Sequence, residues 1–545
     1  MEKKHIKRKN LSIAPCKAAC PAGIDVPRYI RHIRKGEFDE ALAVIREKIP
    51  FPAICGYACY SPCEMNCINR HFGDPIAIRA LKRTAAEMGG ELWKNNLTIA
   101  PATQKKVAIV GSGPSGLTAG YYLATLGHEV NVYEALDVPG GMMRVGIPAY
   151  RLPREALDQE IEDIKAIGVG IQTGQRVESA DALLKKGYDA VYLACGVHQG
   201  MTLGIPGDDL PGVVDGISFL RKVNAGEPVD MQGRVAIVGG GNTAVDAARS
   251  AIRLGVKEVT VVYRRTDAEM TAWEEEVNSA LLEGATINYL TIPTQVTATD
   301  GGLEVTFTRM ELGEPDDSGR PRPIPIAGSE FNQVFDHVIA AIGQMPVGTQ
   351  AMGIALAKGD FIQVDPETLA TDTPGVFAGG DIVTGPASII DAIAYGRGAA
   401  ISIDRHLGGS GIIDQELTTP EKEVLVEDYA AETESRQPIP CIPRADRTCS
   451  FETVELGFTE ASALAEASRC RDCDARQFEV ALFGDGCKEC SYCTEVCSQE
   501  VFGPADSFNE KGYRPMEVKH QERCVGCQLC FYACPDFSID VREVS

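Results

Sequence analysis

Cysteines gather at the two ends of this chain, and their distribution constrains the possible folds more than any other feature. The chain has 19 cysteines. One cluster runs from Cys16 to Cys67 and another from Cys470 to Cys534, while a central stretch of about residues 105–407 holds only Cys195. In a reducing compartment, clustered thiols are metal ligands or redox groups more often than structural disulfides. We therefore expect metal-binding ends around a cysteine-poor core.

Length and composition exclude several classes of protein. The 545 residues are enough for roughly three to five domains. No apolar run approaches the roughly eighteen residues that a membrane span needs. With 53 basic and 76 acidic residues the net charge is −23, which repels nucleic-acid phosphates and anionic lipids. The basic residues 1–10 lead into LSIAPC rather than the apolar core of a secretory signal, so we expect a cytoplasmic protein without membrane insertion or a nucleic-acid partner.

The central stretch predicts two dinucleotide-binding domains. It alternates short β-rich runs with glycine turns and helical patterns, which is typical of an α/β fold with parallel sheets. Two units begin with VAIV and a glycine-rich turn, and their first glycines, Gly111 and Gly239, are 128 residues apart. This duplication indicates two Rossmann-type, doubly wound domains.

The first unit combines a strand, a glycine turn, a helix, a second strand and a terminal acid within thirty residues. Gly111 is expected to make the tight turn, Gly113 to let the backbone approach a pyrophosphate, and Gly116 to allow close helix packing. Glu134 can accept hydrogen bonds from a ribose diol.

Downstream residues favour a flavin in this first site. The segment TPGVFAGGDIVTG places Asp381 after a strand and a glycine pair, as in many two-dinucleotide flavoproteins that use such an acid on the ribityl chain. The strand DAVYLACG is similar to the strand beside FAD in those proteins, and Cys195 within it is more typical of a packed residue than of a redox thiol. The candidate FAD-binding residues at this point are Gly111, Gly113, Pro114, Ser115, Gly116, Glu134, Gly380 and Asp381.

The second unit predicts a nicotinamide-dinucleotide site. An acid usually ends the second strand of an NAD-specific site, but this unit has Tyr263 followed by Arg264 and Arg265. Guanidinium groups pair with a 2′-phosphate, which favours NADP, although the YRR run is also compatible with a solvated strand end. The candidate NAD(P)-binding residues are Gly239, Gly241, Asn242, Thr243, Ala244, Arg264, Arg265 and Gly343.

The C-terminal cysteines follow the pattern of a bacterial two-cluster ferredoxin. Each of two runs has the spacing C-x2-C-x2-C-x3-C, and in this pattern the fourth cysteine of each run ligates the other cluster. A zinc site gives no reason for the third and fourth cysteines. One [4Fe–4S] cluster is thus assigned to Cys487, Cys490, Cys493 and Cys534, and its neighbour to Cys524, Cys527, Cys530 and Cys497.

The N-terminal cysteines do not complete two clusters by themselves. The six thiols there are Cys16, Cys20, Cys55, Cys59, Cys63 and Cys67. Two four-cysteine clusters need eight, and AEASRCRDCD supplies a further pair, Cys470 and Cys473, at the end of a predicted amphipathic helix. Cys441 and Cys449 fit neither set and are expected to be unpaired surface or interface thiols.

Several motifs together resemble one family. GIDVPRYI, CGYACYSPCEMNC, GSGPSG, PGGMMRVGIPAYRLP, GGGNTAVDAARSAIRLG with YRR, and FAGGD are similar to the small (beta) subunit of glutamate synthase. The same fold recurs in the NADPH-binding subunit of the bifurcating ferredoxin–NADP transhydrogenase and in the N-terminal part of dihydropyrimidine dehydrogenase. The resemblance covers about residues 12–405 and 450–475, with a two-cluster ferredoxin appended.

The resemblance implies an N-terminal helical domain holding two [4Fe–4S] clusters beside FAD, with NAD(P)H on the other side of the flavin. It carries Met142 and Arg151 to the FAD site, from a stretch that also includes Gly141. Relatives usually have the RCxxC pair upstream of the first cysteines, so the distal pair here is expected to fold back and join Cys16 and Cys67.

The second N-terminal cluster departs from the family pattern. Family members often supply a Glu or Gln ligand where PIAIRALKR of this chain has Lys82, which is a poor ligand while protonated. The expected ligands are therefore Cys20, Cys59 and Cys63, with Cys55 as the fourth.

The predicted organisation has five parts. They are an iron–sulfur helical domain at 1–100, an FAD-binding domain at 101–230 and 346–411, an NAD(P)-binding domain at 231–345, a linker with the returning CxxC pair at 412–479, and an α+β ferredoxin-like domain at 480–545.

These features predict a flavin- and iron–sulfur-dependent electron-transfer subunit. NAD(P)H exchanges two electrons with FAD, four [4Fe–4S] clusters carry them singly, and other subunits of a redox complex or a soluble ferredoxin are the partners. No catalytic acid–base or nucleophilic set is expected, because the cofactors perform the hydride transfer. The partner is expected to handle an organic substrate such as a 2-oxoacid, aldehyde or acyl-CoA. Alternatives are a free-standing NAD(P)H:ferredoxin oxidoreductase, with or without electron bifurcation, and a non-enzymatic iron–sulfur sensor or scaffold.

Overall fold

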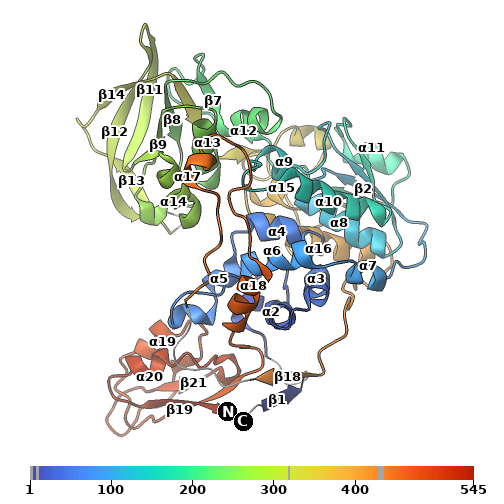
Figure 1. Ribbon diagram of the computed structural model, residues 1–545, viewed down its shortest axis with the longest axis vertical. Coiled ribbons are helices and arrows are strands. Elements are labelled where there is room, and N and C mark those ends of the chain that lie inside the picture. The colour runs from blue at the N-terminus through green and yellow to red at the C-terminus, as the bar shows by residue number, and fades with distance from the viewer. Residues whose placement is uncertain (1–3, 8–11, 317–318, 427–434, 545) are drawn as a thin grey trace.

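The computed structural model describes residues 4–7, 12–316, 319–426 and 435–544. It contains two sheet-based lobes side by side, helices packed below one of them, and a small domain set apart at the lower left of Figure 1. This arrangement confirms the predicted class, a multidomain α/β protein with an N-terminal helical part and a C-terminal ferredoxin-like domain.

The first lobe is built on a parallel five-stranded sheet in the order β17-β5-β2-β3-β4. Strands β2 and β5 are almost wholly buried, as parallel strands covered on both faces should be. The strands are β2 (Lys106–Val110), β3 (Glu129–Tyr133), β4 (Gly170–Gln172), β5 (Ala190–Leu193) and β17 (Val376–Ala378). The helices around them are α8 (Pro114–Thr125), α9 (Met142–Val145), α10 (Arg154–Ala166), α11 (Ala180–Lys185), α15 (Asp381–Thr384) and α16 (Ile389–His406).

The second lobe repeats this plan with the order β10-β9-β8-β15-β7. Its strands are β7 (Val213–Asp215), β8 (Arg234–Val238), β9 (Glu258–Val262), β10 (Thr286–Asn288) and β15 (His337–Ala340). Its helices are α12 (Gly216–Asn224), α13 (Asn242–Arg253) and α14 (Glu274–Glu283). An antiparallel sheet is inserted before β15 and comprises β11 (Thr291–Thr299), β12 (Gly302–Pro315), β13 (Pro321–Pro325) and β14 (Phe331–Phe335).

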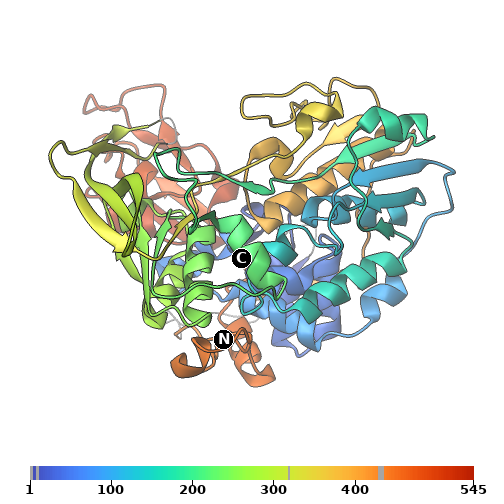
Figure 2. The same ribbon diagram turned by 90° about the horizontal axis from the view of Figure 1, so that it is seen from above.

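Strand β7 places the start of the second lobe earlier in the chain than the sequence predicted. The sequence boundary of 231 assigned residues 213–224 to the first lobe, but β7 pairs in parallel with β15 of the second sheet. A strand of three residues is too short for periodicity to reveal its partner. The chain segments that cross between the lobes are visible from above in Figure 2. They pair with each other through two short antiparallel strands, β6 (Gln199–Gly200) and β16 (Gln344–Met345).

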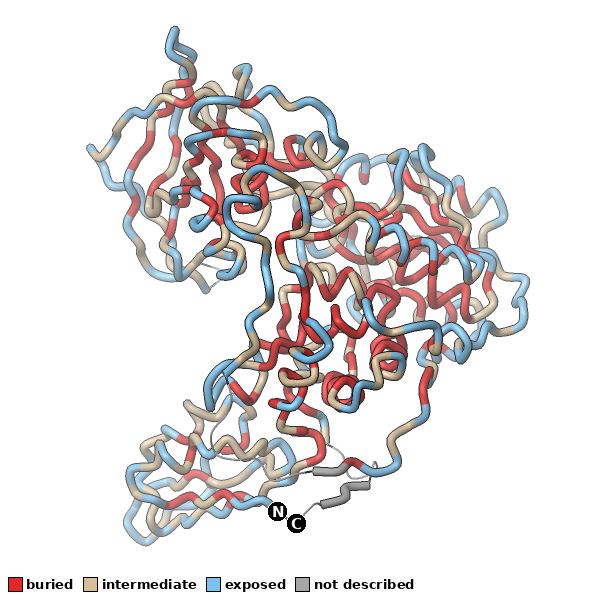
Figure 3. The backbone as a smooth tube through the Cα atoms, viewed as in Figure 1, coloured by how far each residue is buried: buried red, intermediate tan, exposed pale blue. Residues whose placement is uncertain are grey.

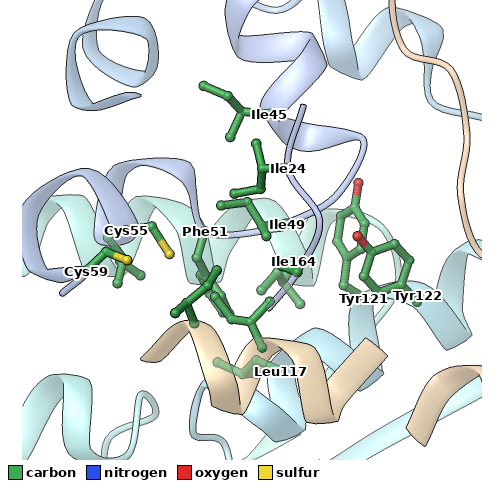
Figure 4. Packing of buried hydrophobic residues seen from close by; sticks show 14 of the residues in the cluster. Ile24, Ile45, Ile49, Phe51, Cys55, Cys59, Leu117, Tyr121, Tyr122 and Ile164 are labelled. Carbon is green, nitrogen blue, oxygen red and sulfur yellow. The ribbon is translucent and has the colours of Figure 1, made fainter. Parts of the chain in front are cut away.

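The N-terminal helices share one hydrophobic core with the first lobe. Figure 4 shows Ile24, Ile45 and Phe51 in the same buried cluster as Leu117 of α8 and Ile164 of α10. The two parts are therefore one packed unit, continuous in the buried segments of Figure 3. Prolines in the first turns start several of these short helices. The helices are α1 (Pro15–Ala18), α2 (Val26–Arg34), α3 (Phe38–Arg46), α4 (Pro52–Ala58), α5 (Pro62–Met65), α6 (Ile78–Met88) and α7 (Leu92–Asn96).

The segment after α16 contacts three parts of the molecule in turn: strand β1 (Lys4–Lys7) near the N-terminus, the first lobe and helix α2. Residues 427–434 of the predicted linker lie outside the described residues; β18 (Glu423–Val426) before them pairs with β1. Residues 435–475, here called the return segment, contain α17 (Arg444–Arg447) and α18 (Glu460–Ser468). Val454 N donates to Tyr150 O in the first lobe (3.0 Å), and α18 packs on α2.

The C-terminal domain has a small core of its own. It contains the antiparallel pairs β19 (Gln477–Leu482) with β22 (Ile539–Val544) and β20 (Phe502–Pro504) with β21 (Met516–Val518), together with α19 (Tyr492–Val496), η5 (Gln521–Arg523) and α20 (Leu529–Ala533). Within the described ranges, no helix is both long enough and apolar enough to cross a membrane.

Glu466 anchors the return segment. Its fully buried carboxylate accepts from Ala77 N (2.7 Å) and Gln437 N (2.8 Å) and pairs with Arg469 (2.7 Å). Glu466→Ala leaves two amides and a buried guanidinium without this partner, so we expect a loss of about 3–5 kcal/mol. Differential scanning calorimetry should show a Tm lower by several degrees, while Glu460→Ala, an exposed change on the same helix, should leave the Tm nearly unchanged. An equal Tm for both variants would contradict the anchoring role.

Candidate functional site

A cavity of about 1270 Å³ lies between the two lobes and is lined by both glycine turns. Its size exceeds the usual range for one small ligand, so it can accommodate large parts of two dinucleotides. All but two of the predicted FAD- and NAD(P)-binding residues line it. The exceptions are Gly116 and Ala244, the third positions of the two fingerprints, which face helix packing instead.

The first glycine turn has the geometry that a pyrophosphate requires. Gly111 has φ +106°, and a Cβ there would lie 2.4 Å from Ala194 O. A Cβ on Gly116 would lie 2.0 Å from Gly111 O, whereas one on Gly113 meets no protein atom within 4 Å. The open side of the turn therefore faces the cavity, at the N-terminus of α8, where backbone N–H groups favour an anion.

Glu134 is held in place by the turn that it faces. One carboxylate oxygen accepts from Ser112 N (2.9 Å) and Ser112 Oγ (2.6 Å), and the other accepts from Leu136 N (2.9 Å). Because a carboxylate has about four acceptor positions, Glu134 can still accept from a ribose diol.

Asp381 and Cys195 line the same cavity close to the first glycine turn. Asp381 follows Gly380 at the start of α15 and accepts from Ala387 N at 3.3 Å. Burial raises its pKa to about 6. Burial also raises the pKa of the Cys195 thiol to about 11, which keeps the thiol protonated and unreactive at neutral pH.

The two arginines of the YRR run differ in their surroundings. Arg265 is buried, and it donates to Asp316 Oδ2 (2.5 Å) and to Pro321 O (2.8 Å). Arg264 is exposed at the cavity wall. The sequence treated the two as equivalent, but the inserted antiparallel sheet supplies partners to Arg265.

Arg151 lies between the lobes. It pairs with Asp246 of α13 (2.7 Å) and Glu276 of α14 (3.0 Å), and its guanidinium lies 5.0 Å from the centre of the Trp273 ring. Met142 and Gly141, from the same stretch, line the cavity near the first turn, and Gly343 lines it near the second.

Sequence reasoning missed several residues of the cavity wall. Tyr60 of the N-terminal part and Trp273 of the second lobe both line it, with ring centres 6.4 Å apart. Asp246 also lines it. The sequence held no signal for Tyr60 or Asp246.

The first group of N-terminal thiols includes the pair from the distant end of the chain. Cys16, Cys67, Cys470 and Cys473 line one small cavity. Burial is the main cause that raises the pKa of the Cys16 thiol well above its usual value, and the charges of Cys470 and Cys473 raise it further. Ion pairs hold the returning loop, because Arg31 contacts Asp474 (2.8 Å) and Arg34 contacts Asp472 (2.9 Å).

The second group surrounds a lysine. Lys82 of α6 is buried, and the groups that act on its charge are Cys59, Cys55, Cys63 and Cys20. Burial by itself lowers the pKa of Lys82, but the neighbouring thiolates outweigh it and raise that pKa. Ala58 and Tyr60, which flank Cys59, line the large cavity, so this second group lies next to the predicted flavin site.

The tail thiols influence one another in two sets. Burial raises the pKa of Cys493 to about 11, with contributions from Cys487, Cys490 and Cys534. Burial likewise raises the pKa of Cys530 to about 12, with contributions from Cys527, Cys524 and Cys497.

Within the described parts of the chain, no three His, Cys, Asp or Glu side chains are arranged to hold a single metal ion. Both terminal parts of the chain nevertheless carry thiols, the soft ligands that iron–sulfur clusters use. Cys441 and Cys449 are exposed.

Known families match all three parts of the chain. Residues 105–396 match the pyridine nucleotide-disulphide oxidoreductase family, residues 10–92 match dihydropyrimidine dehydrogenase domain II with its 4Fe-4S cluster, and residues 486–537 match the 4Fe-4S dicluster domain.

Full-length relatives combine these parts. The chain is 42% identical over 510 residues to the NADP(+)-dependent formate dehydrogenase subunit beta of Moorella thermoacetica, covering 87% of this chain and 72% of that protein. It is 37% identical over 515 residues to the NADPH-Fe(3+) oxidoreductase subunit beta of Geobacter sulfurreducens (84% and 75%). It is 33% identical over 418 residues to the glutamate synthase [NADPH] small chain of Escherichia coli (71% and 87%).

Two glycine substitutions should separate folding from flavin binding. Gly113→Ala adds a methyl group that meets no protein atom but extends toward the cavity, so the variant should keep its Tm and lose at least most of its FAD. Gly116→Ala forces a Cβ against Gly111 O and should lower the Tm as well. Flavin absorbance per chain and calorimetry measure the two effects. Normal flavin content in Gly113→Ala would rule out this turn as the pyrophosphate site.

Proposed function

This chain belongs to the pyridine nucleotide-disulphide oxidoreductase family, and we propose that it carries electrons between NADPH and a partner subunit along one ordered series of sites. It is an NAD(P)-dependent FAD and iron–sulfur oxidoreductase subunit, with [4Fe–4S] domains at both ends. The proposal adds the order of the sites, the number of clusters and the preference for NADP.

One observation carries the proposal: the second group of thiols borders the large cavity and also lies beside the first group. The group containing Cys59 borders the large cavity through Ala58 and Tyr60. Cys63 of that group also acts on Cys16 of the first group. Cys473 precedes β19, the first strand of the tail, by only four residues. The order is therefore flavin cavity, second group, first group, tail.

The residues of the chain have supporting roles in the reaction. When bound, FAD would supply a two-electron hydride acceptor for the nicotinamide and a one-electron donor for the clusters. The residues proposed to position FAD are Gly111, Gly113, Pro114, Ser115, Gly116, Glu134, Gly141, Met142, Gly380 and Asp381. Arg151 fixes the second lobe against the first through Asp246, so it holds the two nucleotides in a constant relation.

Four [4Fe–4S] clusters are proposed. Their ligand sets are Cys16, Cys67, Cys470 and Cys473; Cys20, Cys55, Cys59 and Cys63; Cys487, Cys490, Cys493 and Cys534; and Cys524, Cys527, Cys530 and Cys497. Lys82 is proposed as a counter-charge rather than a ligand, because a buried ammonium requires neighbouring negative charge.

The partner is proposed to be a catalytic subunit. Two relatives are named as beta subunits, one of a formate dehydrogenase and one of an NADPH-Fe(3+) oxidoreductase, which supports a complex over a free-standing enzyme. Formate and ferric iron are accordingly the first substrates to test with the complex.

Cofactor analysis tests the function directly. On anaerobically purified protein we expect about sixteen irons, matching sulfide and one FAD per chain, with the iron–sulfur absorbance bleached by NADPH. About twelve irons would exclude the cluster beside Lys82, and about eight would exclude the joining of Cys470 and Cys473 to the N-terminal thiols. Clusters that stay oxidised in the presence of both NADPH and NADH would contradict the function itself.

Nucleotide preference depends on one arginine. Arg264 is exposed at the cavity wall, whereas Asp316 and Pro321 already engage Arg265, so Arg264 is proposed to bind the 2′-phosphate.

Arg264→Ala should raise the KM for NADPH about ten- to a hundredfold, because one charge-assisted contact contributes about 1.5–3 kcal/mol. The KM for NADH should change little. Steady-state reduction of benzyl viologen measures both, and Arg322→Ala, an exposed arginine on β13, is the matched control. Equal losses with both nucleotides would contradict recognition of the 2′-phosphate.

A further inference from the structure

Exposed aromatic side chains are concentrated in the C-terminal domain. Among the described residues, seven phenylalanine, tyrosine or tryptophan side chains are exposed, and six of them lie in this domain. They are Phe483, Tyr492, Phe508, Tyr513, Tyr532 and Phe537. Scattered apolar exposure needs no explanation, but a local concentration of aromatic residues is typical of a protein interface.

Four of the six surround one end of the domain, and we call them the aromatic rim: Phe483, Phe508, Tyr513 and Phe537. They are 58%, 71%, 40% and 77% exposed, respectively. Hydrogen bonds connect the loops that bear them. Phe483 N donates to Ser538 O (2.8 Å), next to Phe537, and Asn509 N, next to Phe508, donates to Tyr513 O (2.8 Å).

The loops of the aromatic rim contact the site of one tail cluster. Asn509 Nδ2 donates to Cys487 O (2.8 Å) and to Gly484 O (2.9 Å), which ties the loop of Phe508 to the first cysteine of that site. Ser538 N contacts Cys534 Sγ at 3.3 Å, beside Phe537. The rim therefore belongs to the site of Cys487, Cys490, Cys493 and Cys534, which we call the outer site.

The other tail site lies at the opposite end of β19. A Cβ on Gly526, between Cys524 and Cys527, would lie 2.2 Å from the Phe478 ring, near the start of that strand. Gln521 Oε1 accepts from Val480 N at 3.0 Å. The strand begins four residues after Cys473 and ends at Leu482, before Phe483. Six residues of strand span roughly 17 Å, so the outer site is the farther one from the body of the molecule. Figure 1 shows this domain projecting from the body.

Charge restricts what can bind there. Residues 480–545 have eleven acidic and six basic side chains, so a second copy of this acidic chain would be repelled. A partner with basic residues around an apolar centre complements both the charge and the aromatic side chains.

We propose that the aromatic rim is the docking surface for the partner redox subunit, whose face is apolar with a basic border, and that electrons pass between the two proteins at the outer site. This rests on the proposed function. Aromatic side chains that surround the terminal cluster exclude water and fix the approach of the partner, which an exposed cluster alone cannot do. Each NADPH oxidised yields two electrons and one proton, so two one-electron acceptors are reduced for each NADPH.

Cytochrome c, a small basic one-electron acceptor, is the probe. The variant combines Phe483→Ser with Phe537→Ser; the control combines Leu282→Ser with Ile412→Ser, which are 57% and 71% exposed and lie outside the tail. Using the full chain under anaerobic conditions, we expect kcat/KM for NADPH-driven reduction of cytochrome c to fall at least about tenfold in the rim variant and to stay unchanged in the control. The wild-type rate should fall as NaCl is raised. Iron content and bleaching by NADPH establish that the clusters of the rim variant are intact.

The outcomes separate the docking surface from the function. If NADPH bleaches the clusters of both proteins and the rim variant reduces cytochrome c as fast as wild type, the docking proposal is wrong. If the rim variant changes a dimer to a monomer in sedimentation while cytochrome c reduction is normal, the rim joins two copies instead. If NADPH does not bleach the wild-type clusters at all, the proposed function fails, whatever the rim does.

Discussion

Two arginines of helix α2 hold the far end of the chain against its beginning, and the rest of the redox arrangement depends on them. Arg31 pairs with Asp474 and Arg34 with Asp472, and both carboxylates are buried. Breaking a buried pair costs about 3–5 kcal/mol, because the remaining charge has no water to solvate it. The pairs bring two distant thiols to the N-terminal group and also fix where the tail begins.

The shared core explains how the flavin site and the N-terminal thiols keep fixed positions relative to each other. Electron transfer requires fixed distances between cofactors, and close-packed interiors deform little. Helices α3 and α4 pack into the same core as α8 and α10, so the loop that carries Cys59 is part of the wall of the large cavity. The tail has a separate core, which lets it present a docking surface without disturbing the nucleotide sites.

Buried charged side chains have different roles at the domain boundary and at the second thiol group. Between the lobes, Arg151 with Asp246 and Glu276 connects the two domains beside the cavity that they share. Near the second thiol group, a single lysine takes a position surrounded by potential thiolates. Replacing either charge by an apolar group therefore has consequences for the cofactors as well as for stability.

The sequence by itself determined the local motifs. Fingerprint glycines and the tail cysteine spacing depend on neighbours a few residues away, so the α/β class and the nature of the chain as an electron-transfer subunit could be inferred from them. Ligand assignments based on spacing remain predictions.

Tertiary structure decided what depends on distant segments. Strand β7 was assigned to the wrong lobe, because three residues carry no information about their partner in a sheet. Arg264 and Arg265 look alike in sequence, but only packing of the inserted sheet gives Arg265 its partners. Tyr60 reaches the cavity, and the aromatic rim forms, only because loops far apart in the chain meet in space. Long-range packing and burial, which no local pattern records, selected these positions.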